Sequence, residues 1–259
     1  MPLLVIAATA RELSAALGVV HADRLQGQQQ GAVVPLSAHG REVLACVSGL
    51  GVINASLALG AALTRGHANG IEGVLCLGVA GSFDLCAHPL GAVRLVDREV
   101  WPEYGLLATG WCSADATALG FALGQAPGPN GGTALWDSVA WETEAALARL
   151  GLCLGPWDTA KSLTVSGVTA DPERAGLLRA RHQAGLENME GFALAYGCAV
   201  AGVPFVELRT VSNAVGARPP AAWDLPGALE ALGRATQRLF ADPGCGASPL
   251  SSPGASPGD

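Results

Sequence analysis

The sequence predicts an α/β fold with three layers, in which a central mixed β-sheet is flanked by helices. Short apolar runs of strand length alternate along the chain with longer segments of helical periodicity, the pattern of a sheet covered by helices. Two early runs flank residues 38–41, Ala-His-Gly-Arg, and so predict a hairpin that makes the sheet mixed. Half of the 259 residues are hydrophobic and only 14% are charged, which allows a large core.

The first elements follow one another closely. Residues 3–8 are continuously apolar, as in a strand buried on both faces. Thr9 is a suitable N-cap for a helix over residues 11–17, and Glu12 falls in the first turn of that helix. The hairpin comes next, and the turn Ser-Gly-Leu-Gly after it leads into a helix over residues 52–65.

The rest of the chain repeats this alternation. A Pro- and Gly-rich stretch at 126–133 predicts a surface loop, and residues 226–240 form a final amphipathic helix. Residues 1–241 are expected to form one domain, followed by a disordered Pro/Gly/Ser/Ala-rich tail at 242–259. Further strands are expected at 32–37, 42–48, 73–79, 91–100, 162–168 and 205–211, and further helices at 142–150, 172–182 and 190–201.

Composition excludes several classes of function. The net charge of −7, without any Lys/Arg cluster, argues against binding to a nucleic-acid backbone. The seven cysteines are odd in number and include no CxxC, so we expect core thiols in a reducing cytoplasm. The five histidines lack metal-ligand spacing, and no metal or cofactor is expected. Residues 43–63 are uncharged, but their glycines and polar residues favour strand, turn and helix over a membrane span.

Polar residues gather where the predicted strands end, which is where ligands bind in such sheets. Residues 49–54 match only part of a GxGxxG dinucleotide motif, since Asn54 replaces the third glycine, so a tight turn is the favoured interpretation. Glu187 and Glu190 stand at the start of a helix, where either alone could simply complement the helix dipole. The strand ends in question are residues 9–12, 48–51, 80–82, 168–170 and 212–213.

Five short motifs, in order across residues 3–235, are similar to those of the purine-nucleoside phosphorylase/hydrolase superfamily. The resemblance implies a nucleoside as small-molecule substrate, no cofactor, and a homo-oligomer built on dimers. The motifs are Thr9-Ala10-Arg11-Glu12, Ser48-Gly49-Leu50-Gly51, Gly78-Val79-Ala80-Gly81, Met189-Glu190-Gly191 and Arg209-Thr210-Val211-Ser212-Asn213.

The resemblance also implies roles for individual residues. Glu12 would be the general base that activates water for attack at the sugar C1′. Glu190 would accept hydrogen bonds from the ribose 2′- and 3′-hydroxyls, with Met189 packed against the sugar. Gly81 belongs to the glycine turn at a strand end, and the segment that ends at Val168 and Thr169 resembles the base-pocket strand. The alternative for Glu12 is an ordinary exposed acid in a first helical turn.

Asn213 indicates which class of purine base is released. Adenine-releasing nucleosidases of this superfamily place an Asp there, whereas an Asn amide can donate to O6 and accept the proton at N7 of a 6-oxopurine. The alternative is that Asn213 only caps a turn. The segment Val215-Gly216-Ala217-Arg218-Pro219, followed by Trp223, is similar to that of futalosine hydrolases, which release hypoxanthine from futalosine in menaquinone synthesis.

Futalosine carries a carboxylate on its 5′ side, and Arg98, Arg218 and His88 are the candidate cations for it. Trp101 and Tyr104 are candidates for lining the part of the site that receives this 5′ substituent. Other functions remain open at this stage: another purine nucleosidase of the methylthioadenosine or aminofutalosine type, a nucleoside phosphorylase, or a nucleoside-binding protein without catalysis. A dinucleotide-dependent oxidoreductase is a further alternative.

Overall fold

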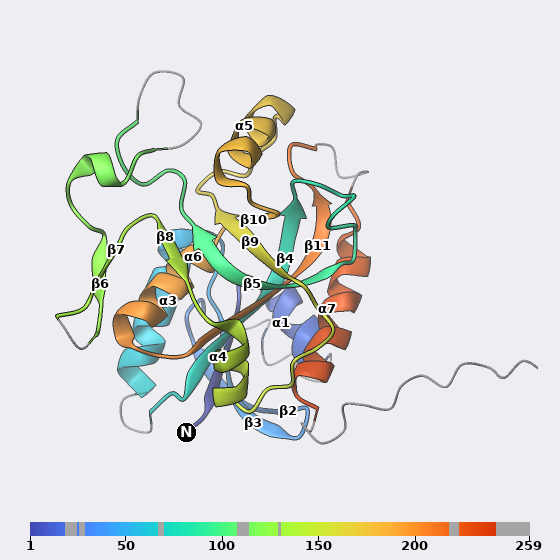
Figure 1. Ribbon diagram of the computed structural model, residues 1–259. Coiled ribbons are helices and arrows are strands. Elements are labelled where there is room, and N and C mark those ends of the chain that lie inside the picture. Colours follow the sequence, from blue (N-terminus) through green and yellow to red (C-terminus); the bar gives the residue numbers. More distant parts are fainter. Residues whose placement is uncertain are drawn as a thin grey trace, which may run out of the picture.

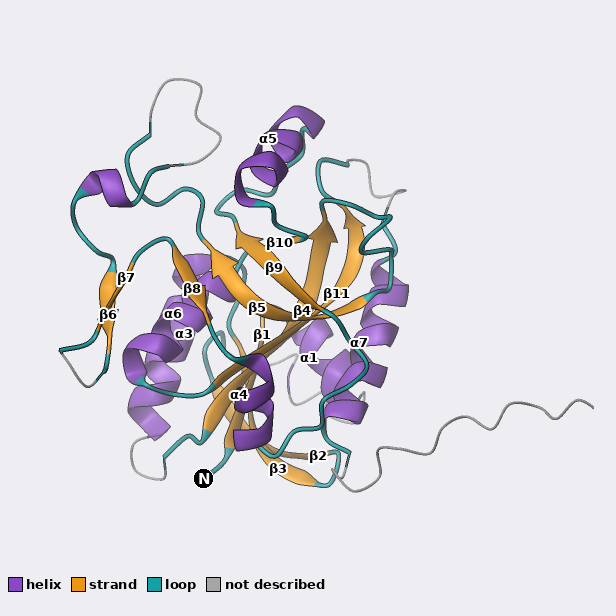
Figure 2. Ribbon diagram, viewed as in Figure 1, coloured by secondary structure: helices purple, strands orange, loops and turns teal. Residues whose placement is uncertain are grey.

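The computed structural model describes residues 1–18, 25, 29–66, 70–107, 114–128, 131–217 and 223–241. They form a nine-stranded mixed sheet with helices on both faces, which confirms the predicted class (Figure 1, Figure 2). The strand order is β10-β9-β5-β11-β4-β1-β3-β2, and β8 pairs with β5. Arg218 and the tail at 242–259 lie outside the described residues.

The predicted strands and helices are present with shifted ends. Four short strands, β6, β7, β8 and β10, were not predicted. The strands are β1 (Leu3–Ala7), β2 (Val33–Ala38), β3 (Arg41–Val47), β4 (Gly73–Ser82), β5 (Val93–Val100), β6 (Gly124–Ala126), β7 (Thr133–Leu135), β8 (Ser138–Ala140), β9 (Thr159–Thr164), β10 (Leu186–Asn188) and β11 (Phe205–Ala214). The helices are α1 (Ala10–Leu17), α3 (Val52–Gly66), α4 (Thr143–Arg149), α5 (Pro172–His182), α6 (Gly191–Ala201), α7 (Leu225–Leu239) and the 3-10 turn η2 (Thr117–Leu119).

The strand β1 shows why the apolar runs are continuous. Leu3 and Val5 belong to the core that α1 and α7 cover, whereas Leu4 and Ile6 belong to the core on the opposite face, which α3 and α6 cover. Successive strand residues point to opposite faces, so both sets must be apolar when both faces are covered. All four side chains are fully buried.

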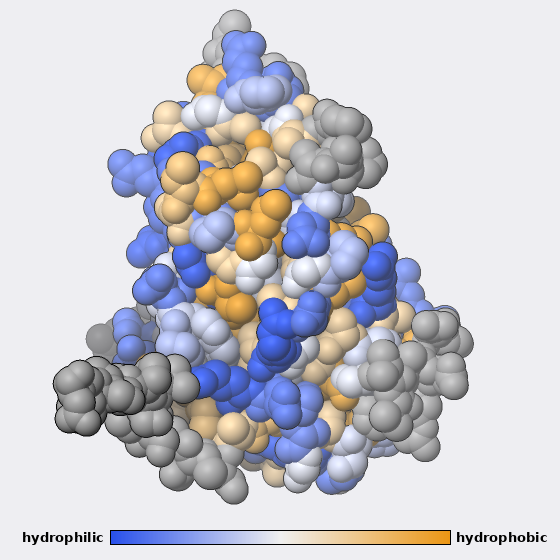
Figure 3. All heavy atoms as spheres, turned by 90° about the vertical axis from the view of Figure 1, so that its right-hand side faces the viewer, coloured by the Kyte–Doolittle hydropathy of each residue, from blue (hydrophilic) through white to orange (hydrophobic). Residues whose placement is uncertain are grey.

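The helix α7 is amphipathic and covers one face of the sheet together with α1. Its Leu229, Leu232 and Leu239 are buried, while Arg234 on the other side of the helix is exposed. Each buried leucine contributes roughly 1.5–3 kcal/mol relative to exposure. Figure 3 views the molecule from the α7 side of Figure 1, where hydrophobic patches lie among hydrophilic ones. No helix in the described residues is long and apolar enough to cross a membrane.

The short strand β10 closes part of the sheet into a ring. It pairs in parallel with β9 and antiparallel with β4, so β4, β11, β5, β9 and β10 form a closed ring of paired strands. In this closure Leu186 pairs with Ser82 and Glu187 with Gly81. The ring therefore brings residues 186–188 to the carboxyl ends of β4 and β11.

Two predicted elements have ends that differ from the prediction. The strand expected at 162–168 is β9, which ends at Thr164, because its partner β10 is only three residues long and offers no further pairing after Asn188. The loop expected at 126–133 overlaps the two ends of a hairpin, because β6 and β7 pair with each other from Gly124 to Leu135. Residues 129–130 of that loop lie outside the described residues.

Candidate active site

A pocket of about 180 Å³ opens at the carboxyl ends of β1, β4 and β11, beside β10 and the start of α6. Most of the predicted site residues line it, although they come from distant parts of the chain. Thr169 is buried next to the pocket, and Arg218 is not described. The predicted residues in the lining are Glu12, Gly81, Val168, Met189, Glu190 and Asn213.

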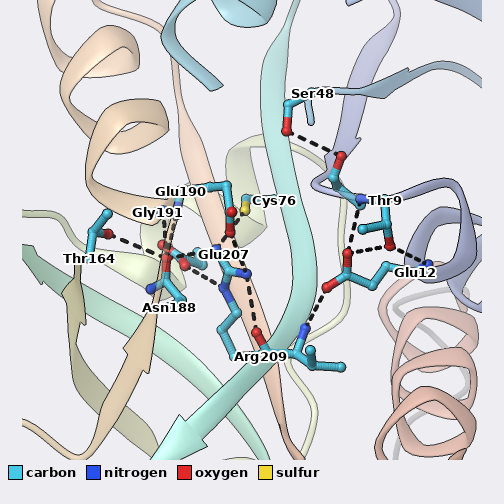
Figure 4. A network of polar contacts seen from close by, with 12 residues as sticks. Thr9, Glu12, Ser48, Cys76, Thr164, Asn188, Glu190, Gly191, Glu207 and Arg209 are labelled. Carbon is cyan, nitrogen blue, oxygen red and sulfur yellow. Dashed lines mark hydrogen bonds and ion pairs between the residues drawn. The ribbon is translucent and has the colours of Figure 1, made fainter. Parts of the chain in front are cut away.

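Glu12 is held by a capping box at the start of α1. Its Oε2 accepts hydrogen bonds from the Thr9 backbone N–H (3.0 Å) and hydroxyl (2.7 Å), and the Thr9 hydroxyl accepts from the Glu12 N–H in return. Its Oε1 accepts from the Val79 N–H at 3.0 Å (Figure 4). Three donors on one buried carboxylate fix its orientation toward the pocket.

Glu190 is buried on the other side of the pocket. Its Oε1 accepts from the Gly51 N–H at 2.9 Å, and its Oε2 lies 3.8 Å from Arg209 Nη1. Burial raises the pKa of Glu190, while Arg209 and the Gly51 N–H oppose that rise by favouring the ionised form. The glycine-rich turn around Gly51, with φ +87° there, thus directs a backbone donor at a carboxylate.

Asn188 holds the backbone that carries Glu190. Its Oδ1 accepts from the N–H groups of Glu190 (2.8 Å) and Gly191 (2.7 Å), and its Nδ2 donates to Glu99 Oε1 at 2.6 Å. The Thr164 hydroxyl donates to the other oxygen of Glu99 at 2.6 Å. These bonds tie the start of α6 to the sheet beneath it.

Arg209 lies at the centre of this buried network (Figure 4). Its Nε donates to Glu207 Oε1 at 2.7 Å, and both side chains are almost completely buried. Gly78 and Gly191 leave the space for these groups. A Cβ on Gly78 would lie 2.6 Å from Arg209 Nη1 and 3.0 Å from Glu12 Oε1. Real Cβ atoms do not approach other atoms as closely as 2.6 Å, so the close contact of the Glu12 carboxylate, the Arg209 guanidinium and β4 requires glycine there.

Two acids of this network, Glu99 and Glu207, were not predicted as functional. A Cβ on Gly191 would meet Glu99 Oε1 at 2.4 Å and Glu207 Oε1 at 2.5 Å, so both carboxyl groups approach the same backbone atom. Burial raises the pKa of both groups, and the Glu207 carboxylate raises that of Glu99 further. The signal in the sequence was a pair of charged residues, Glu207 and Arg209, inside an apolar strand.

One end of the pocket is formed by Gly81, Asn213 and Glu187. Asn213 Oδ1 accepts from the Ser212 hydroxyl at 2.8 Å, and its Nδ2 donates to the Ala214 carbonyl at 2.9 Å. Each group keeps one more bonding position, because an amide carbonyl has two lone pairs and an amide nitrogen two hydrogens. Glu187 Oε1 accepts from the backbone N–H of Thr169 at 3.0 Å.

The other sequence candidates lie elsewhere. His88 Nδ1 accepts from Arg94 Nε at 2.9 Å, and Arg98 is exposed on β5. Trp101 stacks on Tyr104 with ring centroids 5.7 Å apart. None of these lines the pocket within the described part of the chain. In the same residues no group of three or more His, Cys, Asp or Glu side chains is placed to hold a metal ion.

Comparison with known proteins identifies the family. The model of the phosphorylase superfamily matches residues 2–241. The chain belongs to the phosphorylase superfamily. Within this superfamily it is similar to the futalosine hydrolase of Thermus thermophilus, with 37% identity over 210 residues that cover 76% of this chain and 80% of the relative. The resemblance expected from the motifs is confirmed at both levels.

Solved structures of the superfamily share the fold. A methylthioadenosine/adenosylhomocysteine nucleosidase from Colwellia psychrerythraea, solved with adenine, matches with a TM-score of 0.65 and 20% identity over 92% of both chains. The native futalosine hydrolase of Helicobacter pylori matches with a TM-score of 0.62 and 17% identity over 92% of this chain and 97% of that one. At these identities the likeness establishes the superfamily fold.

Proposed function

We propose that the protein hydrolyses the N-glycosidic bond of futalosine, releasing hypoxanthine and leaving dehypoxanthine futalosine. The observation that carries this proposal is the pocket in which Glu12 and Glu190 face a sugar-sized space while Asn213 stands at the end where a base would lie. A relative from Thermus thermophilus that matches 76% of the chain at 37% identity is a futalosine hydrolase.

The site residues then have distinct roles. Glu12 takes a proton from water as the water oxygen bonds to C1′ and the bond from C1′ to the base breaks. Glu190 accepts hydrogen bonds from the ribose hydroxyls. The carboxylates of Glu12 and Glu190 both stabilise the oxocarbenium-like sugar electrostatically. Met189 packs against the sugar, while Gly81 and Val168 contact the base. The departing base takes up a proton at N7 from solvent, and Glu12 later returns its proton to solvent, so that one water is consumed and the protons balance. Asn213 donates a hydrogen bond to O6 and accepts one from N7–H.

Hydrolysis is favoured over phosphorolysis by the charge of the pocket. Three carboxylates, those of Glu12, Glu187 and Glu190, line it, and a phosphate anion would meet their repulsion. The test is turnover of futalosine in phosphate-free buffer and again after addition of phosphate. We expect equal rates and a free sugar product in both. A rate that requires phosphate, with a sugar 1-phosphate as product, would identify a phosphorylase.

The apolar helix face beside the pocket supports a homo-oligomer built on dimers. Leu50, Ile53 and Leu57 are 60%, 73% and 69% exposed, and Leu50 also lines the pocket. On α3 the side chains of Ile53 and Leu57 lie one turn apart, so they form one stripe. We expect Ile53→Glu to convert the assembly to monomers in light scattering. We also place the enzyme in the cytoplasm, as a single domain over residues 1–241, in menaquinone synthesis.

A further inference from the structure

The sheet places Glu187 and Asn213 on either side of Gly81. The antiparallel pairing of β10 with β4 sets Glu187 opposite Gly81, and the pairing of β11 with β4 sets Asn213 opposite the same glycine. Directly paired residues on neighbouring strands project to the same face of a sheet. A Cβ on Gly81 would lie 2.9 Å from Val215 Cγ2 and 3.1 Å from Asn213 Nδ2, so glycine at this position allows the Asn213 amide to lie directly against β4.

Glu187 has an acceptor that no group in the described part of the chain uses. Its side chain is 6% exposed and lines the pocket, and its Oε1 is occupied by the Thr169 N–H. Its Oε2 is buried and has no hydrogen-bond partner among the described residues. A buried carboxylate oxygen without a donor is costly, so such a group in a pocket wall indicates a ligand donor.

The position of Glu187 in the chain argues against a role in complementing a helix dipole. The residue lies in β10, and α6 begins only at Gly191, so Glu187 is not in the first turn of that helix. Its backbone pairs with strands on both sides and not with the helix. Complementing the helix dipole therefore does not account for a buried carboxylate here.

We propose that Glu187 accepts the N1–H of a 6-oxopurine base while Asn213 reads O6 and N7. A 6-oxopurine carries a hydrogen on N1, which a carboxylate can accept, whereas a 6-aminopurine presents a lone pair at N1 and would be repelled. Glu187 is then a specificity-determining residue. It reads the edge of the base that lies away from the sugar and from Glu12 and Glu190. This inference rests on the proposed function and adds the recognition of the base to it.

The variant Glu187→Gln isolates this bond. The Gln carbonyl can keep the Thr169 N–H, and the amide NH₂ then replaces Oε2 with a donor that opposes N1–H and matches an unprotonated N1. We expect kcat/KM for futalosine to fall roughly 10–100-fold, the effect of a lost charge-assisted bond, while kcat/KM for aminofutalosine is kept or rises. The matched control is Glu173→Gln on the exposed face of α5, which should leave the ratio of the two unchanged.

A binding measurement gives a second readout that needs no turnover. Wild-type protein should bind hypoxanthine at least about 10-fold more tightly than 1-methylhypoxanthine, and Glu187→Gln should lose that preference. Equal binding of the two bases by the wild type, or an unchanged substrate ratio in a folded Glu187→Gln, would overturn the inference. If the wild type instead released adenine from aminofutalosine and left futalosine intact, the proposed function itself would be wrong.

Discussion

The buried Arg209 gives the strongest prediction about stability. Its guanidinium forms ion pairs with Glu207, 2.7 Å away, and Glu190, 3.8 Å away, and all three side chains are almost fully buried. Arg209→Met removes the charge and keeps much of the apolar volume. Two carboxylates are then left without their cation, and breaking a buried pair in this way costs about 3–5 kcal/mol. Urea unfolding followed by circular dichroism measures the loss directly.

The matched control is Arg234→Met. Arg234 pairs with Glu230 on the exposed side of α7, with side chains 65% and 73% exposed, so the expected loss is about 0.5 kcal/mol or less. The direction in which the loss of stability in Arg209→Met changes with pH follows from the raised pKa values of Glu190 and Glu207. Without Arg209 these pKa values rise further, so ionising the two groups costs more stability, and the loss grows as the pH rises above the ordinary glutamate pKa of 4.5. Equal losses for Arg209→Met and Arg234→Met would refute the reasoning.

Four further predictions follow from the site and its surroundings. Glu12→Gln should lower kcat about 10²–10⁴-fold with little change in KM, as steady-state kinetics would show; near-normal turnover would remove Glu12 as the base. Asn213→Asp should shift the preference toward 6-aminopurine nucleosides in a competition assay, and an unchanged ratio would count against its role. Gly78→Ala should cost about 1–3 kcal/mol of stability by overpacking against Arg209, whereas Gly60→Ala, with nothing within 4 Å of the new Cβ, should be neutral or stabilising in the same unfolding assay. Burial lowers the pKa of His182 from 6.5 to about 4, so its contribution to stability is complete above pH 6.5 and is lost as the pH falls toward 4; His182→Gln should flatten the dependence of Tm on pH in that window, and an unaltered slope would contradict this.

The fold could be predicted from the sequence because its strands are covered on both faces. Continuous apolar runs such as residues 3–7 and the capping residue Thr9 carry their own local signals, and both are found in the structure. The strand β10 had no such signal, because three residues, Leu186–Asn188, are too short to show a period. Its existence depends on pairing with β4 and β9, which lie far away in the sequence.

The site was predicted in part, by the motifs at strand ends. Those motifs name Glu12, Glu190 and Asn213, which the structure brings around one pocket. The pairing of Glu187 with Gly81 could not be predicted, because the two residues lie far apart in the sequence and only the closure of the ring joins them. The approach of Glu99 to Glu207 likewise depends on the pairing of β5 with β11, which no local pattern records.

The identity of the released base tests the central claim most directly. Futalosine, inosine, methylthioadenosine and aminofutalosine are each incubated with the enzyme, and the free base is measured by chromatography. The account predicts hypoxanthine from futalosine, at a rate that does not depend on phosphate, with the other three nucleosides cleaved far more slowly. Adenine as the preferred product, or cleavage only in the presence of phosphate, would contradict it.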